Sequence, residues 1–250
     1  MANTMAWNLN RSQRNVRLFE IGRAYTVKNG SPLETRVVTI GATGLAREKG
    51  VAETPREYEF ADLKGDLDHI GELAGGFNWS AAARPWQNPA RAGEIALASS
   101  ASGERRDIGA AGQLSQRIAD RFKLRQDVFL AEMTLDPFYS SYRLSRAARR
   151  YRPISRFPAI ERDFALLLAD GTAFAIVREA INGLGITEIA SIEAVDLYRG
   201  KNVPAGKFSL LVRVTFQSQE ATLTEAQVND FSTKILAALE KKLGAMLRTS

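Results

Sequence analysis

Three carboxylates follow one another closely in this 250-residue chain, at Asp62, Asp66 and Asp68, and the only histidine, His69, comes directly after them. Carboxylate oxygens bind hard cations, so this spacing is compatible with a metal site. The three acids also lie at the start of one predicted helix, where negative charge interacts favourably with the helix dipole. We therefore interpret them as helix-capping residues, and His69 as a surface or packed residue rather than a base or a ligand.

Two residue types common in catalytic and metal sites, cysteine and histidine, are absent or nearly so. The chain has no cysteine, which excludes disulfides, thiolate metal sites and cysteine nucleophiles. The glycine-containing stretches Gly41–Gly44, Gly71–Gly76 and Gly109–Gly112 match neither a P-loop nor a dinucleotide-binding fingerprint, and we interpret them as turns. Much of enzyme chemistry is therefore excluded.

The composition is that of a folded, soluble protein. Hydrophobic residues make up 45% of the chain and charged residues 25%, which excludes collagenous, low-complexity and wholly disordered classes. No window approaches the roughly 20 apolar residues of a membrane-spanning helix, and the N-terminus carries no secretory signal. We expect a cytoplasmic location and no membrane partner. Because Met5, Trp7 and Leu9 precede the first clear structural unit without a capping residue, we also expect a fragment of a longer chain.

The excess of positive charge is confined to one segment. The chain has 34 Lys and Arg against 28 Asp and Glu, a net charge of +6, and residues 138–162 alone hold seven arginines and one glutamate. The arginines are Arg143, Arg146, Arg149, Arg150, Arg152, Arg156 and Arg162. Pro153, Pro158 and the lack of a sustained apolar period are typical of a domain boundary. The arginines either belong to a solvated linker or contact the phosphates of a polyanion.

The last hundred residues predict two helices among four strands. A short apolar run ends at the turn Asp170–Gly171, and residues 208–217 place apolar and mostly polar side chains on alternate faces. The expected elements are strands at 162–168, 189–198, 208–217 and 245–248, a helix at 174–184, and a helix that follows a capping box at Thr222–Glu225 and ends at Gly244. This order predicts a ferredoxin-like βαββαβ domain, in which both helices cover one face of the sheet and leave the other open.

The first part of the chain predicts an α+β fold with antiparallel strands. The expected elements are strands at 15–25, 35–40, 94–98 and 128–135 and a short helix at 114–122. A longer helix follows Tyr58 and has four apolar residues at helical spacing, namely Leu63, Leu67, Ile70 and Leu73. We place the domain boundary near Arg150, with one domain at residues 1–149 and a second at 150–250.

Six short motifs follow one another along the second domain. They are Arg156-Phe157-Pro158, Arg162-Asp163, Asp196-Leu197-Tyr198-Arg199-Gly200, Gly206-Lys207-Phe208-Ser209-Leu210, Thr222-Leu223 and Leu247-Arg248. In order and spacing they resemble the ferredoxin-fold anticodon-binding domain that ends the bacterial phenylalanyl-tRNA synthetase β subunit. The resemblance spans residues 152–248.

This resemblance implies that the second domain binds the anticodon stem and loop of a tRNA. It implies that Asp196 and Ser209 contact the first anticodon base and that Tyr198 stacks on it, a mode of recognition that suits unpaired loop bases. Flanking basic residues would hold phosphates, and the candidates are Arg156, Arg162, Arg199, Lys201 and Lys207. From the residues alone, the simpler interpretation is that Tyr198 and Asp196 pack and pair across a hairpin.

Two segments of the first domain also carry a resemblance. Residues 17–25, Arg-Leu-Phe-Glu-Ile-Gly-Arg-Ala-Tyr, resemble the first strand of motif 2 of class II aminoacyl-tRNA synthetases, and residues 58–66 resemble the catalytic-like module of the same β subunit. A catalytic motif 2 continues into an arginine and an acid, whereas Thr26 and Val27 follow Tyr25 here, and no motif 3 arginine is found. Without these cations adenylate formation lacks its charge stabilisation, so we expect a non-catalytic scaffold.

Taken together, the resemblance implies the C-terminal part of the β subunit of a cytoplasmic α2β2 phenylalanine–tRNA ligase. The expected partners are the tRNA for phenylalanine and a catalytic α subunit, which would use ATP and magnesium, and no cofactor is expected in this chain. Two alternatives stay open. The second domain could be a small-ligand-sensing regulatory module, or the first could be a nucleotide-dependent enzyme with unrecognised catalytic residues.

Overall fold

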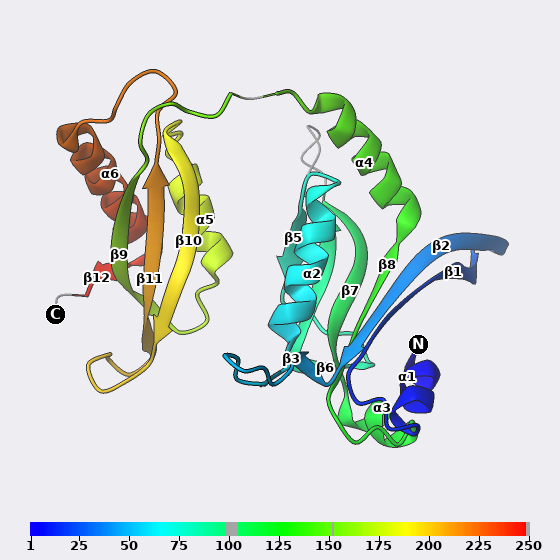
Figure 1. Cartoon of the computed structure of the whole chain (residues 1–250). Coiled ribbons are helices and arrows are strands. Elements are labelled where there is room, and N and C mark those ends of the chain that lie inside the picture. Colours follow the sequence, from blue (N-terminus) through cyan, green and yellow to red (C-terminus); the bar gives the residue numbers. More distant parts are fainter. Residues whose placement is uncertain (99–104, 152, 249–250) are drawn as a thin grey trace. The chain divides into compact units, whose positions relative to one another are not determined.

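The computed structural model describes residues 1–98, 105–151 and 153–248. They form two compact units, Met1–Arg150 and Tyr151–Ser250, which we call unit 1 and unit 2 (Figure 1). Both combine helices with antiparallel sheets, which confirms the predicted α+β class. Arg152 of the basic segment lies outside the described residues. None of the described helices is long and apolar enough to cross a membrane.

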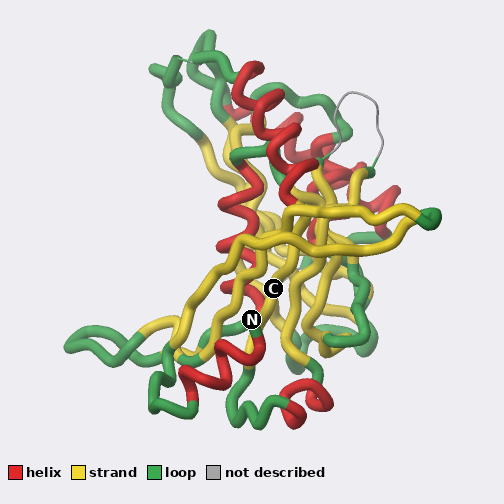
Figure 2. Tube along the Cα trace, turned by 90° about the vertical axis from the view of Figure 1, so that its right-hand side faces the viewer, coloured by secondary structure: helices red, strands yellow, loops and turns green. Residues whose placement is uncertain are grey.

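The described part of unit 1 contains an antiparallel sheet of six strands in the order β1-β2-β8-β7-β6-β5. The strands are β1 (Val16–Lys28), β2 (Ser31–Thr43), β5 (Phe77–Ser80), β6 (Gln87–Leu97), β7 (Arg106–Leu114) and β8 (Val128–Thr134). The first two form one long hairpin around Asn29 and Gly30, whose positive φ angles suit a two-residue turn. Its outer half extends beyond β8, which pairs only with Val37–Thr43 (Figures 1 and 2). A ribbon of β3 (Leu45–Arg47) and β4 (Arg56–Glu57) follows.

Two apolar clusters lie on opposite faces of this sheet. Helices α2 (Phe60–Glu72) and α4 (Leu135–Ala148) cover the larger cluster, which includes Leu63 and Phe129. Helices α1 (Ala2–Leu9) and α3 (Gln116–Arg121) cover the smaller one, which includes Met5 and Leu130. Leu73 was expected on the buried side of α2 but is 44% exposed, because the helix ends at Glu72 and the chain turns away.

The interpretation of Gly109–Gly112 as a turn is wrong, since these residues lie within β7. A Cβ at Gly109 would lie 2.1 Å from the carbonyl oxygen of Glu132 in β8, and one at Gly112 would lie 2.8 Å from the carbonyl oxygen of Arg91 in β6. The glycines therefore permit a close approach of neighbouring strands rather than a chain reversal. In the other two stretches, Gly41 lies within β2 and Gly71 within α2, and the chain turns only at Gly44 and at Gly75–Gly76, all with positive φ.

The basic segment is only partly a linker, which corrects the sequence-based interpretation. Residues up to Ala148 belong to α4, and β9 begins at Ile160, so residues 149–159 alone connect the two units. Leu135 and Phe138 of α4 are buried, and the Ser141 hydroxyl donates to the carbonyl oxygen of Ala74 at 2.7 Å. The buried side of α4 is narrow, and arginines occupy much of its exposed surface. The sequence therefore shows no sustained apolar period over this helix.

Unit 2 has the predicted βαββαβ order, with a four-stranded antiparallel sheet in the order β10-β11-β9-β12 among its described residues. Its elements are β9 (Ile160–Ala169), α5 (Phe174–Asn182), β10 (Ile189–Tyr198), β11 (Lys207–Phe216), α6 (Glu225–Leu243) and β12 (Met246–Leu247). Both helices pack on one face of the sheet, through residues such as Val177, Ile235 and Val212 (Figure 1). The ferredoxin-like prediction is confirmed.

Helix α6 begins two residues later than the predicted capping box implied. Its N-cap is Thr224, whose hydroxyl accepts from the backbone N–H of Gln227, while the Gln227 side chain accepts from the Thr224 N–H. Thr222 and Glu225 matched the same pattern in the sequence, but the reciprocal bonds form only at the later pair. The helix ends at Gly244, in the left-handed conformation, as predicted.

Candidate nucleic-acid interface

The sheet face of unit 2 that the helices leave uncovered brings three predicted site residues together. Tyr198 of β10 lies opposite Ser209 of β11, which lies opposite Leu167 of β9. Asp196 lies in the next row, opposite Leu211. Paired residues share a face and have Cβ atoms about 5 Å apart. An aromatic ring, a hydroxyl and a carboxylate therefore lie within one small area, which we call the Tyr198 end of the open face.

A β-bulge in β10 determines which way these side chains point. Glu193 pairs with Arg213 and Ala194 with Val212, but the register then shifts by one residue, so that Asp196 pairs with Leu211. Without this extra residue, strict alternation would turn Asp196 and Tyr198 toward the helices. The bulge at Val195 thus places both on the open face together with Ser209.

The side chain of Tyr198 has two close neighbours. The Cζ atom of Arg248 lies 4.9 Å from the ring centroid. A Cβ added to Gly200 would lie 2.1 Å from the Tyr198 hydroxyl oxygen, so the hydroxyl end of the side chain lies directly against this glycine. Tyr198 keeps 39% exposure, whereas Ser209 beside it has 5%. The ring is therefore positioned but still accessible.

Sequence reasoning missed the position of Arg248. It was noticed only as part of a closing Leu247-Arg248 motif, without a role. The backbone N–H of Arg248 donates to the carbonyl oxygen of Ala165 at 2.8 Å, which continues the pairing of β12 with β9. That pairing returns the end of the chain to the sheet, 50 residues after Tyr198, and no local pattern could have shown it.

The predicted basic residues near Tyr198 do not all point the same way. Arg199 forms an ion pair with Asp170, and its Cζ lies 5.0 Å from the ring centroid of Phe208, which belongs to the core on the helix side. Lys201 is exposed in the connection from β10 to β11, and Lys207 lies two residues before Ser209 on the same face of β11. The two lysines are thus near the Tyr198 end, while Arg199 is engaged elsewhere.

The structure does not bring Arg156 and Arg162 to the Tyr198 end. Arg162 pairs with Val214 on the helix-covered face, five residues along β9 from Leu167, a distance of about 17 Å along the strand. Arg156 precedes β9 at the same far end, where the neighbouring Ser155 hydroxyl donates to the carbonyl oxygen of Ser218 at 2.6 Å.

Ion pairs occupy the opposite end of the open face. The Arg213 guanidinium donates to both carboxylate oxygens of Asp163, at 2.8 Å each, and lies 3.2 Å from Glu161. These hydrogen bonds lower the pKa of Asp163. Glu193 pairs with Arg213 across the strands, so acids outnumber bases here. We call this the Arg213 end.

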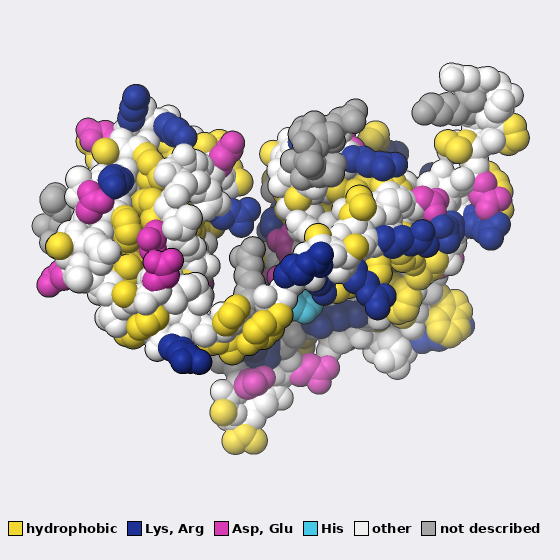
Figure 3. Space-filling model, turned by 90° about the horizontal axis from the view of Figure 1, so that it is seen from above, with side chains coloured by type: hydrophobic (Ala, Val, Ile, Leu, Met, Phe, Trp, Pro, Cys, Tyr) yellow, Lys and Arg dark blue, Asp and Glu magenta, His cyan; other side chains and the backbone are white. Residues whose placement is uncertain are grey.

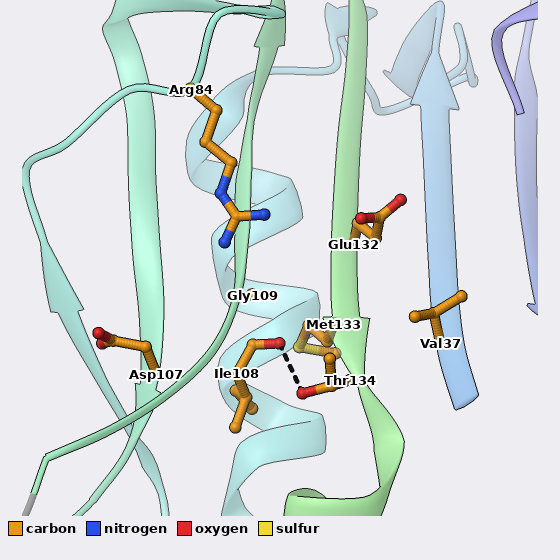
Figure 4. A pocket seen from close by; sticks show the side chains of 8 residues that line it. All are labelled: Val37, Arg84, Asp107, Ile108, Gly109, Glu132, Met133 and Thr134. Atoms are coloured by element: carbon orange, nitrogen blue, oxygen red, sulfur yellow. Dashed lines mark hydrogen bonds between the residues drawn. The ribbon is translucent and has the colours of Figure 1, made fainter. Parts of the chain in front are cut away.

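In unit 1, the sheet face opposite α2 and α4 carries acids. One row crosses five strands and consists of Glu20, Thr39, Glu132, Ala110 and Glu94. Beside it lies a pocket of about 150 Å³, lined by Arg84 and Glu132 among others, where the Thr134 hydroxyl donates to the carbonyl oxygen of Ile108 at 3.1 Å (Figure 4). Ligand pockets usually measure about 300–1,000 Å³, so this one is too small for a nucleotide.

The first carboxylate of α2 caps the helix, as predicted. Asp62 accepts from the backbone N–H of Glu59 at 2.8 Å and completes a capping box with the Glu59 side chain. It also accepts two hydrogen bonds from Arg56, at 2.7 and 2.8 Å, which lower the pKa of Asp62.

The other two carboxylates attach α2 to neighbouring elements instead of capping it. Asp66 accepts from the Tyr58 hydroxyl at 2.7 Å, and burial together with this bond raises the pKa of Tyr58. Asp68 accepts from the Trp79 indole N–H at 2.6 Å. The three acids therefore bond different side chains, and Asp68 also pairs with Lys64 of the same helix. The His69 side chain is 86% exposed, which confirms its interpretation as a surface residue.

Comparison with known proteins accounts for most of the chain. Residues 1–135 match the phenylalanyl tRNA synthetase beta chain CLM domain. The chain belongs to the phenylalanyl-tRNA synthetase beta chain family. Residues 155–248 match the ferredoxin-fold anticodon binding domain, which contains all three residues gathered at the Tyr198 end. The resemblance indicated by the motifs of both domains is thereby confirmed.

Curated relatives include phenylalanine–tRNA ligase beta subunits from several bacteria. Those of Carboxydothermus hydrogenoformans, Geobacter sulfurreducens and Thermotoga maritima are 34%, 32% and 29% identical to this chain. The matches cover 97%, 96% and 98% of this chain, and 30% of each relative. The chain therefore spans about a third of the length of these relatives.

Proposed function

We propose that unit 2 binds the anticodon stem-loop of the tRNA for phenylalanine, with the first anticodon base at the Tyr198 end. The observation that carries this proposal is the convergence of Asp196, Tyr198 and Ser209 on one small area of the open face, which depends on the bulge at Val195. The match of residues 155–248 to an anticodon-binding domain supports it.

The chemistry of the three side chains suits an unpaired base. The exposed ring of Tyr198 offers a stacking surface, the Asp196 carboxylate accepts from the ring and exocyclic N–H groups of a guanine, and the Ser209 hydroxyl donates or accepts. Lys201 and Lys207 are near enough to contact loop phosphates. Arg156 and Arg162, at the far end of the unit, would contact phosphates away from the loop, and the ion-paired Arg199 would position the hairpin.

Unit 1 acts in this proposal as a non-catalytic scaffold for a catalytic α subunit. The names of the relatives support membership of a phenylalanine–tRNA ligase, in which an α2β2 assembly in the cytoplasm charges tRNA and the α subunit uses ATP and magnesium. The row containing Glu20, Glu132 and Glu94 supports the scaffold role, because three carboxylates repel the phosphates and carboxylate of an aminoacyl-adenylate reaction.

The test is a binding titration of the 250-residue chain against two RNA stem-loops, one with the phenylalanine anticodon and one with its first base changed. We expect the unmutated chain to prefer the first. Tyr198→Ala should weaken binding of the first stem-loop about 5- to 150-fold, since a stacked base contributes about 1–3 kcal/mol, while Tyr198→Phe keeps the ring and most of the affinity.

Equal affinities of the unmutated chain for the two stem-loops would overturn the base-reading role. Pyrophosphate exchange by the purified chain with phenylalanine and ATP would overturn the scaffold role of unit 1. A calorimetric titration with free phenylalanine separates the anticodon-binding and scaffold roles from a ligand-sensing module. Only the ligand-sensing module predicts a saturable heat of binding for phenylalanine.

A further inference from the structure

Four exposed arginines lie at the C-terminal end of α4 in unit 1. Arg143 and Arg146 are three residues apart on one side of the helix, and Arg149 and Arg150 directly follow its last residue, Ala148. We call these four residues the α4 arginine cluster. At the rise of an α-helix, residues 143–150 span about 10 Å. Figure 3 looks down on this end of unit 1, where Lys and Arg side chains gather on the surface.

Within the described residues, no carboxylate forms an ion pair with any member of the cluster. Arg149 donates to the carbonyl oxygen of Glu72 at 3.5 Å, and Arg150 donates to the carbonyl oxygens of Ala147 and Arg149 at 2.8 and 3.0 Å. Six other arginines of unit 1 pair with acids, namely Arg23, Arg36, Arg47, Arg56, Arg91 and Arg105, and others, such as Arg17 and Arg117, donate to carbonyl oxygens instead. What distinguishes the cluster is that four such arginines lie close together in the chain, at residues 143–150, and that no carboxylate of the described residues neutralises them.

Stabilisation of the helix explains only part of this cluster. A cation in the last turn interacts favourably with the helix dipole, which accounts for Arg146, and the Arg150 side chain bonds the carbonyl oxygen of Ala147 at the helix end. Arg143 precedes the last turn, beyond the range of that effect. The buried Leu135 and Phe138 meanwhile fix the helix on the sheet, so a packed helix presents Arg143 and Arg146, while Arg149 and Arg150 begin the connection to unit 2.

We propose that the α4 arginine cluster is a second RNA-binding site, which contacts the phosphodiester backbone of an RNA helix without reading its bases. Guanidinium groups match phosphate oxygens in a two-pronged geometry and stay charged at every physiological pH. A membrane surface fits less well, because an interfacial helix needs a broad outward apolar side, whereas Leu144 and Tyr139 are the large apolar residues of α4 that are exposed.

The test uses the complete 250-residue chain and an RNA duplex of about 12 base pairs without a loop, titrated at several salt concentrations. The variant is Arg143→Gln with Arg146→Gln, because neither side chain bonds the helix end. We expect weaker duplex binding and a slope of log K against log salt that is smaller by about 2, roughly one unit for each lost phosphate contact.

The matched control is Arg23→Gln with Arg47→Gln, which removes the same charge from two exposed arginines of unit 1 that already pair with Glu34 and Glu53. Its salt slope should equal that of the unmutated chain. Circular dichroism verifies that α4 stays helical in each variant.

The outcome is independent of the proposed anticodon site. Tyr198→Ala should leave duplex binding unchanged, and the α4 variant should keep the preference between the two stem-loops. An unchanged duplex affinity and salt slope in the α4 variant would overturn the inference. A second result would also overturn it: the α4 variant loses binding to phosphatidylserine vesicles or to polyglutamate but still binds the duplex. The cluster would then bind a membrane or an acidic protein.

Discussion

The two ends of the open face of unit 2 use the same strands but differ in how their polar groups are satisfied. At the Arg213 end, one guanidinium is bound by Asp163 and Glu161. At the Tyr198 end, Asp196 is exposed and has no ion-pair partner among the described residues, and the ring of Tyr198 is 39% exposed. The polar side chains of the Arg213 end therefore bond one another, whereas those of the Tyr198 end are available to a ligand.

The same contrast recurs in unit 1. Six arginines there are paired with carboxylates, whereas the α4 arginine cluster has main-chain partners or none within the described residues. A polar group with an internal partner gains little from a ligand, because the ligand must replace a bond that already exists. Polar side chains that lack an internal partner among the described residues therefore indicate a ligand-binding surface better than the number of charged residues does.

Gly200→Ala should have the largest effect among changes that leave the Tyr198 end chemically complete. The new methyl group would overlap the Tyr198 hydroxyl, so the ring must leave its position. We expect binding of the phenylalanine anticodon stem-loop to weaken about 5- to 30-fold, a loss of about 1–2 kcal/mol of stacking, with the melting temperature nearly unchanged. Gly65→Ala in α2, where a Cβ meets nothing within 4 Å, is the control. Full binding by Gly200→Ala would show that the ring orientation is irrelevant.

Arg248→Gln should have an intermediate effect. It removes the guanidinium from the ring of Tyr198, an interaction of about 0.5–1 kcal/mol at exposed sites, so stem-loop binding should weaken about 2- to 5-fold. Arg248→Lys keeps the charge and should retain the salt dependence of binding. If Arg248→Gln binds the stem-loop as tightly as the unmutated chain, Arg248 does not position the ring.

Arg213→Gln should have the smallest effect on RNA. Arg213 is four residues from Ser209 along β11, or about 14 Å, which exceeds the screening length of about 8 Å at physiological salt. We therefore expect stem-loop affinity to change less than about twofold. A larger loss would remove the distinction between the two ends.

The same variant makes a prediction about pH. Arg213 lowers the pKa of Asp163, so its stabilisation is present above the ordinary aspartate pKa of about 3.9 and is lost as the pH falls through the lower folded value. The melting temperature of Arg213→Gln should therefore lie slightly below that of the unmutated chain at about pH 7, and the difference should vanish in acid. A difference that persists in acid would assign it to packing.

Local patterns predicted the elements of unit 2 more completely than those of unit 1. The strands and helices of unit 2 alternate regularly between core and surface, and β10 was predicted at its observed bounds. In unit 1, β7 was missed because its glycines fit between strands that are distant in sequence, and α4 was missed because arginines mask its narrow apolar side. In both cases, contacts with a neighbouring element explain why these residue types stand at these positions.

By itself, the sequence determined the order of elements in unit 2, its ferredoxin-like topology and the family, because apolar periodicity and ordered motifs are properties of the chain. Only the tertiary structure decided which polar groups share a surface. One extra residue in β10 reverses the alternation and turns Asp196 and Tyr198 to the open face, and the pairing of β12 with β9 brings Arg248 to them. Register and long-range pairing result from contacts between distant strands, which no local pattern records.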